Sequence, residues 1–334
     1  MRRSSCHLRG LYQPARPPLR EVLVRRRQHR ISGREHAVQS PPSFLSSQSP
    51  IFRDMFSIPQ PPAADDTMVE GCIVVHLQDT MKDIQNLLEL LYDTWSVHKF
   101  HKPLHVSMLR TMLRMSRKYG FKHLRQEAIN RLRMEFPSTL REFGESLGEY
   151  RFIDGEVDEI EFSVMLLARE QGIKSILPAI YVYVCVNRHS EDLEKYFVEN
   201  RHILPVDLPI SLLLGRDRIT RAVATTTFRW LNKGTVPCKE CTIPAVCAAT
   251  ARMISMQLLE MPTANLVQRA VFPWDRQRLE GAPLCAKCVA TAKEVFENGR
   301  KVVWERIPDY FGLNDPALAG DWDEDEGEAE PEKL

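Results

Sequence analysis

The segment Phe44-Leu-Ser-Ser-Gln-Ser-Pro-Ile-Phe-Arg-Asp-Met-Phe56 contains the strongest fold signal in this chain of 334 residues. Ser49 is a favoured N-cap residue, and Pro50 suits the first turn of a helix, where a missing N–H group costs nothing. Apolar residues then recur at helical spacing and form one face. The segment therefore predicts two short helices that meet at a Ser-Pro corner. We expect its phenylalanines to be buried core residues: Phe44, Phe52 and Phe56.

Downstream of this corner, the apolar pattern predicts one strand followed by three helices. Cys72–Leu77 is rich in β-branched residues and is flanked by Gly71 and Asp79, which is typical of a buried strand. Helical spacing recurs in three further segments, residues 84–92, 104–119 and 121–132. Gly120 separates the last two segments and is the residue type that commonly ends a helix.

The order of these elements and the amino-acid sequence of the Ser-Pro corner resemble those of the BTB/POZ domain, in the form common in basidiomycete fungi. The resemblance covers residues 43–134, and the family's final helix hairpin has its Tyr, Leu and Ala at the positions of Tyr119, Leu124 and Ala128. It implies an α+β fold, in which a BTB/POZ-like core of helices with a small sheet occupies residues 41–136. A mostly α-helical domain would follow at residues 150–313.

The resemblance also implies a function in protein binding and not an enzyme. BTB domains associate with themselves as homodimers, and many link a substrate to a cullin-type ubiquitin ligase. We expect the interaction surface on the helix hairpin Leu104–Leu132 together with the strand Cys72–Leu77. The sequence contains no Gly-rich phosphate loop, no Gly-x-Ser-x-Gly elbow and no His-Glu-x-x-His motif.

Residues 1–40 do not fit the opening of such a domain, which begins with two strands joined by a hairpin directly before the Phe44 helix. They contain ten arginines, no lysine and two acids, Glu21 and Glu35. We expect one strand at most, near residues 19–24, in a basic segment that is otherwise disordered. A transit peptide, a nucleic-acid-binding arm and an altered first exon are the other interpretations of this composition.

The rest of the composition indicates a soluble protein of the cytoplasm or nucleus. The net charge is +1, residues 314–334 form an acidic tail that we expect to be disordered, and no apolar stretch reaches the roughly 18 residues of a membrane helix. The alternative function is a nuclear regulator that binds nucleic acid through the basic arm or through a zinc-stabilised C-terminal domain. The second half has no concentrated basic face with interleaved aromatics, which argues against nucleic acid as a partner.

The apolar pattern of the second half predicts a series of helices with one extended linker between them, Leu204–Pro209. Gly172 is expected to end the first of these helices. The predicted helices are Glu161–Gln171, Ser175–Asn187, Glu191–Glu199, Leu212–Leu231 and Arg252–Glu260.

Two Cys-x-x-Cys pairs are the chemically most informative feature of this half. They comprise Cys238, Cys241, Cys285 and Cys288. Two thiolates from one turn can reach the same metal, so these four residues predict a structural zinc site, in which Cys247 could replace one ligand. A lysine near each pair is expected to lower the thiol pKa. The other interpretation is free or packing cysteines; a redox pair is disfavoured because neither motif follows a strand in a βαβ unit.

Overall fold

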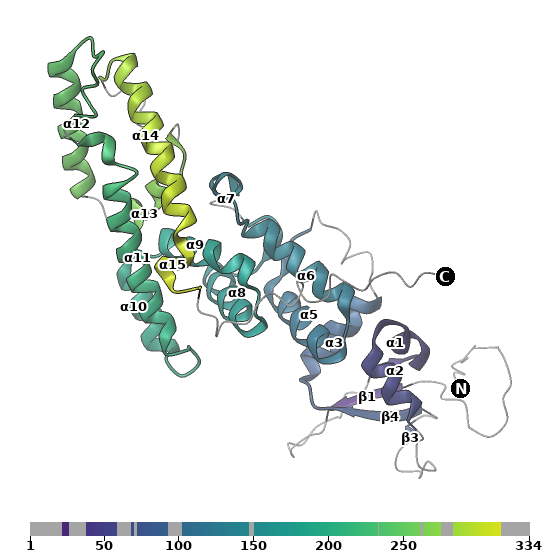
Figure 1. Ribbon diagram of the computed structural model, residues 1–334. Coiled ribbons are helices and arrows are strands. Elements are labelled where there is room, and N and C mark those ends of the chain that lie inside the picture. The colour runs from purple at the N-terminus through teal and green to yellow at the C-terminus, as the bar shows by residue number, and fades with distance from the viewer. Residues whose placement is uncertain are drawn as a thin grey trace, which may run out of the picture. The chain divides into compact units, whose positions relative to one another are not determined.

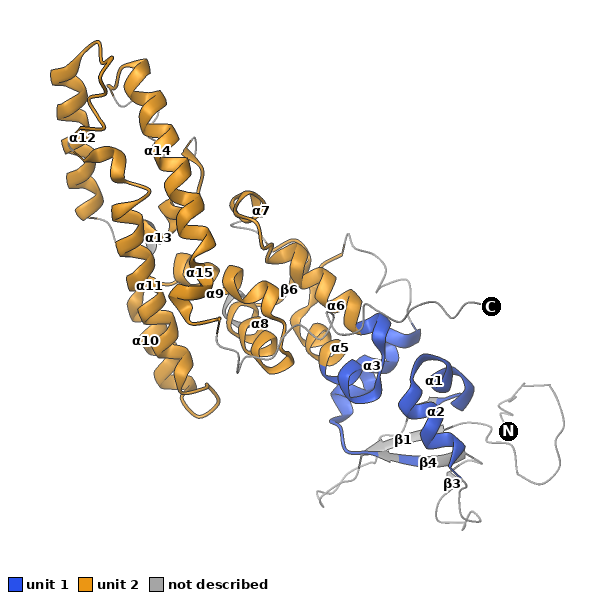
Figure 2. Ribbon diagram, viewed as in Figure 1, with its two compact units in different colours: residues 1–94, 114–124 blue, residues 95–113, 125–334 orange. Residues whose placement is uncertain are grey.

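The computed structural model describes residues 22–26, 38–58, 68–69, 72–92, 102–146, 150–232, 234–260, 263–274 and 283–314. The chain forms two compact units, residues 1–94 with 114–124 and residues 95–113 with 125–334 (Figure 2). Two helices, α5 (Val106–Tyr119) and α6 (Lys122–Glu135), each contribute residues to both units. The described part is mostly helical with small sheets, which places the fold in the α+β class.

The first unit contains a four-stranded sheet in the order β2-β1-β4-β3. Figure 1 labels three of these strands, β1, β4 and β3. Its strands are β1 (Val22–Arg26), β2 (Val38–Ser40), β3 (Met68–Val69) and β4 (Cys72–Leu77). β1 pairs antiparallel with β2 and parallel with β4, with Val22 opposite both Ser40 and Ile73. The expectation of a single strand before Phe44 was therefore wrong, because β2 is too short to show an alternating pattern and is defined by its pairing with β1.

The predicted Ser-Pro corner joins α1 (Pro42–Gln48) to α2 (Pro50–Ser57). Ser49 Oγ accepts a hydrogen bond from the Phe52 N–H at 3.0 Å, as expected of an N-cap residue, and its hydroxyl donates to the Tyr119 carbonyl. Gly120 ends α5 with a positive φ of 73°, and a Cβ at this position would lie 3.0 Å from Pro50 Cγ. The glycine therefore serves both the helix end and the close approach of the corner.

The phenylalanines of this segment are buried to different degrees. Phe52 is 1% exposed and stacks on Tyr119 with ring centroids 4.8 Å apart. Phe44 and Phe56 are only half-buried, so the expectation of three buried anchors holds for Phe52 alone. Phe44 stacks instead on Tyr92, an exposed residue at the end of α3 (Met81–Tyr92), because the face of α1 that enters the core is occupied by Leu45.

The second unit is built from helices and one short parallel strand pair. The pair comprises β5 (Leu104–His105) and β6 (Ile153–Asp154). The helices after α6 are α7 (Leu140–Ser146), α8 (Val157–Gln171), α9 (Leu177–Asn187), α10 (Ser190–Asn200), α11 (Asp207–Thr225), α12 (Pro244–Leu259), α13 (Thr263–Val271), α14 (Ala286–Glu305) and α15 (Ile307–Phe311), with short 3-10 turns at Lys174–Ile176 and Arg229–Leu231. α11 packs against α9, α13, α14 and α15.

Two predicted boundaries in this unit have different outcomes. Gly172 ends α8 in the left-handed conformation, as predicted. The extended linker predicted at Leu204–Pro209 is wrong in its second part, because α11 begins at Asp207 and includes Pro209. A proline is tolerated there since the N–H groups of a helical first turn have no intrahelical partner.

Several sequence predictions fall on residues that the structure does not describe. They concern most of the basic segment, residues 1–21 and 27–37, and the acidic tail from residue 315. Within the described ranges, no helix combines the length and the apolar composition that a membrane span requires.

Candidate metal centre

The cysteine cluster of the second unit forms where α12 and α14 begin, and both helices start at the same end of the unit (Figure 1). Cys238 and Cys241 lie in a tight turn before α12, in which the Cys241 N–H donates to the Cys238 carbonyl at 3.1 Å. Cys247 lies in the first turns of α12. Cys285 is the N-cap residue of α14, and Cys288 lies in the first turn of that helix. Two helix N-termini, which favour negative charge, therefore converge on the sulfur atoms.

Four of these sulfur atoms have the spacing of a single tetrahedral metal site. The Sγ atoms of Cys241, Cys247, Cys285 and Cys288 all lie within 4.8 Å of one another. The Cys241 and Cys285 sulfurs are 3.7 Å apart. Zinc–sulfur bonds of about 2.3 Å in tetrahedral geometry place the sulfurs about 3.8 Å apart, so the cluster is compatible with one zinc ion.

Backbone N–H groups surround the same sulfur atoms. The Cys285 N–H donates to Cys247 Sγ at 3.2 Å, and the Cys238 N–H donates to Cys288 Sγ at 3.3 Å. Cys241 Sγ accepts from the Ile243 N–H. Such bonds stabilise the thiolate form, which is the form that binds metal.

The thiols differ strongly in acidity. The backbone N–H groups of Cys288 and Thr242 lower the pKa of the Cys285 thiol to about 5. Burial, with further contributions from neighbouring thiols, raises the pKa of Cys288 and that of Cys241. The cluster therefore accommodates one thiolate readily, whereas several thiolates at this spacing require a compensating cation.

The expected role of the lysines in this effect is wrong. Lys287 Nζ forms an ion pair with the carboxylate of Glu240 at 2.9 Å, and both side chains are exposed. The low pKa of Cys285 arises from backbone N–H groups, chiefly those of Cys288 and Thr242. The ion pair links the two Cys-x-x-Cys turns at the surface.

The cluster differs by one residue from the four cysteines predicted from spacing. Cys241, Cys285 and Cys288 lie in it as predicted, and Cys247 occupies the place expected for Cys238. Cys238 Sγ lies beside the group, 3.6 Å from Cys288 Sγ. The sequence did raise Cys247 as a substitute ligand, but only the path of the chain into α12 brings its side chain to the others.

The remaining described cysteine of the second unit, Cys185, has no such environment. It is fully buried in α9, and burial raises its pKa to about 12. Cys185 is therefore a packing residue.

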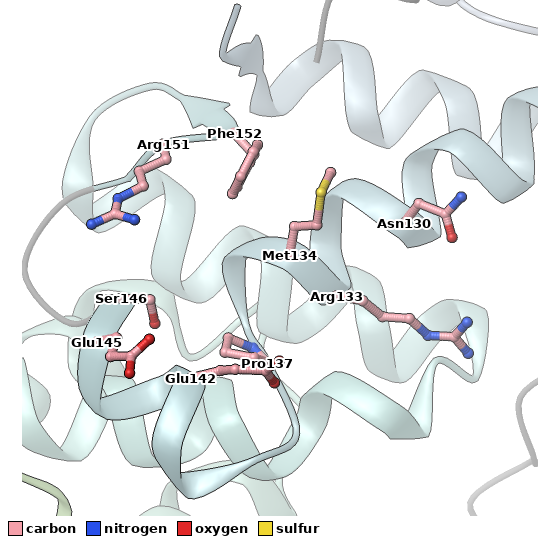
Figure 3. Close-up of a pocket in the computed structure, with 9 residues that line it drawn as sticks. All are labelled: Asn130, Arg133, Met134, Pro137, Glu142, Glu145, Ser146, Arg151 and Phe152. Atoms are coloured by element: carbon pink, nitrogen blue, oxygen red, sulfur yellow. The ribbon is translucent and has the colours of Figure 1, made fainter. Parts of the chain in front are cut away.

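A surface hollow of about 580 Å³ between α6, α7 and the segment before β6 is a weaker candidate site (Figure 3). Met134, Pro137 and Phe152 give it an apolar part, and acidic side chains of α7 lie along its rim. Glu142 accepts a hydrogen bond from Thr139 at 2.6 Å, and Glu145 accepts one from Arg141. Both carboxylates thus bond to residues of α7 or directly before it. The hollow therefore shows no set of catalytic or ligand-binding groups that point toward one another.

Comparison of the chain with protein-family models, with curated proteins and with solved structures gave no match.

Proposed function

We propose that this chain is a protein–protein interaction adaptor, with a BTB/POZ-type module in its first unit and a structural zinc ion in its second. The observation that carries the adaptor proposal is the order of elements in the first unit. β1 and β2 form an antiparallel pair directly before the α1–α2 corner, and β4 returns parallel to β1. A BTB/POZ domain opens with such a strand pair before the same helical corner.

The residues that carry the family resemblance also hold this corner together. The Tyr119 hydroxyl donates to Asp79 Oδ2 at 2.5 Å, while the Tyr119 carbonyl accepts from Ser49. The ring of Tyr119 stacks on Phe52. One tyrosine thus connects the end of α5 to the corner and to the loop after β4. These contacts support an architecture in common with BTB/POZ domains over a chance similarity of sequence.

An adaptor needs exposed surface for its partners, and the first unit leaves apolar side chains of α2 accessible. Ile51 is 44% exposed and Ile58, which follows the helix, is 59% exposed. The resemblance suggests self-association and the binding of a cullin as the roles of such a module. Apolar surface next to a helical corner suits either of these partners.

The adaptor proposal is tested with purified full-length protein and two matched variants of α2. Ile51→Glu places a charge on the exposed apolar surface, whereas Arg53→Glu changes the charge of an exposed residue of the same helix. We expect Ile51→Glu to weaken self-association in sedimentation equilibrium, or binding of a purified cullin in a pull-down, and Arg53→Glu to have little effect. Nuclease treatment should change neither result.

If the wild-type protein is monomeric and does not bind the cullin, the adaptor proposal is overturned. If the protein instead binds DNA or RNA with an affinity that falls steeply with salt, the nucleic-acid regulator is the correct class.

Zinc is the metal that the cysteine cluster favours. Soft thiolate ligands in tetrahedral geometry select zinc among the common divalent ions. Four thiolate ligands leave no open position for water or substrate, so the ion would be structural and not catalytic. Its place between the starts of α12 and α14 suits a role in joining these two helices.

Metal analysis of purified protein tests the zinc site directly. We expect one zinc ion per chain in the wild type and its loss in Cys247→Ser. Cys185→Ala removes a cysteine that lies in α9, away from the cluster, and should retain the metal. A wild type that contains no zinc, even after refolding in its presence, would overturn this part of the proposal.

A further inference from the structure

Five thiols meet at the metal centre, although a tetrahedral ion accepts four. Cys238 is the additional one, and its Sγ lies 3.6 Å from Cys288 Sγ. Cys238 is half-buried, whereas Cys288 is fully buried. A thiol outside the four-sulfur group is thus held against the sulfur of one of its members.

A tetrahedral structural zinc ion is complete with four ligands, so a fifth thiol beside it would stay unbound. A bound thiolate shares its electron pair with zinc, so it is shielded from oxidants compared with a free thiolate. Cys238 lies outside the four-sulfur group and would have no such protection, and its side chain is only half-buried. Its sulfur lies in contact with that of Cys288, the proposed ligand in the first turn of α14.

We propose that Cys238 and Cys288 form an oxidation switch, in which a hydroperoxide joins them as a disulfide and thereby releases the zinc ion. The inference rests on the proposed zinc site and adds a regulatory function to it.

The reaction balances with hydrogen peroxide as the oxidant. The Cys238 thiolate attacks one peroxide oxygen, the O–O bond breaks, and Cys238 becomes a sulfenic acid while hydroxide leaves and takes up a proton. Cys288 then detaches from zinc, and its thiolate attacks the Cys238 sulfur. The S–S bond forms as the S–O bond breaks, and a second hydroxide leaves and becomes water. Two thiols are oxidised and one peroxide is reduced to two waters.

The geometry favours this pair over the other sulfurs of the cluster. Disulfide formation requires the two sulfurs to approach from 3.6 Å to about 2.05 Å, a movement that the short turn carrying Cys238 can supply. Cys241 and Cys285 are 3.7 Å apart, but both belong to the four-sulfur group and would be held by the metal. Loss of Cys288 leaves zinc with three thiolates and weakens its hold on the start of α14.

The test uses zinc-loaded full-length protein treated with hydrogen peroxide. Released zinc is measured with a chromogenic chelator, and the disulfide is located by mass spectrometry of peptides. We expect the wild type to release zinc in step with formation of a Cys238–Cys288 disulfide. A dithiol reductant together with added zinc should restore the starting state.

Cys238→Ser is the deciding variant, with Cys185→Ala as the matched control. We expect Cys238→Ser to be purified with as much zinc as the wild type and to release it about tenfold more slowly, since its reactive thiol is gone. Cys185→Ala should behave as the wild type. Cys238→Ala provides a second version of the test in case the serine variant folds poorly.

Three results would overturn the switch. They are release of zinc from Cys238→Ser at the wild-type rate, absence of zinc from both Cys238 variants, and a disulfide that maps to another pair. A wild type without zinc would instead overturn the zinc site itself and the switch with it. Zinc content of the wild type thus separates the two failures.

Discussion

The corner of the first unit and helix α12 of the second unit differ in how much apolar side chain they bury. At the corner, Phe52 is 1% exposed and packs on the Tyr119 ring. α12 has no comparable core, because Met256 is 63% exposed and Leu259 is 85% exposed. Its buried residues are few and mostly small: Cys247, Thr250, Ala251 and Ile254.

This difference indicates what each region requires in order to fold. Burial of apolar surface contributes about 25 cal/mol per Å², so the aromatic corner can hold its own geometry. A helix that buries two small residues, one isoleucine and a cysteine gains little from this source. The cysteine cluster lies at the start of that helix, where a metal cross-link would supply the missing stabilisation. Packing should therefore dominate in one region and metal binding in the other.

Removal of the proposed zinc ion should give the largest effect and should confine it to the second unit. Binding of structural zinc contributes about 10–16 kcal/mol of apparent free energy in small zinc-binding peptides, and this free energy is coupled to folding. We expect chelation to abolish amide-exchange protection in α12 and in the first turns of α14. Hydrogen exchange with mass spectrometry measures this region by region.

The corner provides the internal control for this experiment. Amides of α2 and of the end of α5 should retain their protection after chelation. Equal loss of protection in both regions would contradict the expected division between packing at the corner and metal binding at α12. The metal would then be a general requirement for folding.

Phe52→Ala should produce the second largest effect, this time in the first unit. Truncation of a buried phenylalanine costs about 3–5 kcal/mol, since a cavity adds to the lost transfer free energy. We expect a marked drop in the free energy of unfolding measured with urea, with zinc content unchanged. Phe56→Ala is the matched control, because Phe56 is only half-buried and should cost less. Equal costs for the two substitutions would place Phe52 outside the core.

Local signals in the sequence predicted this corner well. Ser49 caps α2, and Gly120 ends α5, because each residue acts on groups within a few positions of itself. The strand pair before α1 was missed for the opposite reason. β2 is a strand only because it pairs with β1 across residues 27–37, and no short pattern encodes that pairing.

The cysteine cluster shows the same limit at the level of side chains. The spacing of the two Cys-x-x-Cys pairs was enough to predict that residues 238–241 and 285–288 meet. It could not decide between Cys238 and Cys247, because that choice depends on how the chain turns into α12. The burial of the phenylalanines shows the limit too, since helical spacing defines a face but not how deeply each residue enters the core.

Gly299→Ala should have an intermediate effect and tests whether the second unit also contains a region held by packing. A Cβ at Gly299 would lie 2.4 Å from the Thr227 backbone nitrogen and Cα, so the backbone itself would have to move. Overpacking of this kind costs about 1–3 kcal/mol. The higher helix propensity of alanine offsets up to about 1 kcal/mol of this loss in the free energy of unfolding.

We therefore expect a net loss of stability in urea unfolding for Gly299→Ala. Lys301→Ala, at an exposed position of the same helix, serves as the control. A gain in stability for Gly299→Ala would mean that α14 does not approach Thr227 closely.

Ser49→Ala should give the smallest effect, and it separates hydrogen bonding from packing at the corner. Ser49 is fully buried, its Oγ accepts from the Phe52 N–H, and its hydroxyl donates to the Tyr119 carbonyl. Loss of an N-cap costs about 0.5–2 kcal/mol, and here a buried carbonyl also loses a donor. Ser49→Thr retains the hydroxyl and should recover most of this free energy in the same urea titration. The added methyl group is the only new atom group that the corner must accommodate. If Ser49→Ala is as stable as the wild type, the aromatic contacts alone hold the corner. If instead it costs as much as Phe52→Ala, the cap contributes as much as the apolar core, and the contrast with the cysteine cluster would rest on hydrogen bonds and not on packing.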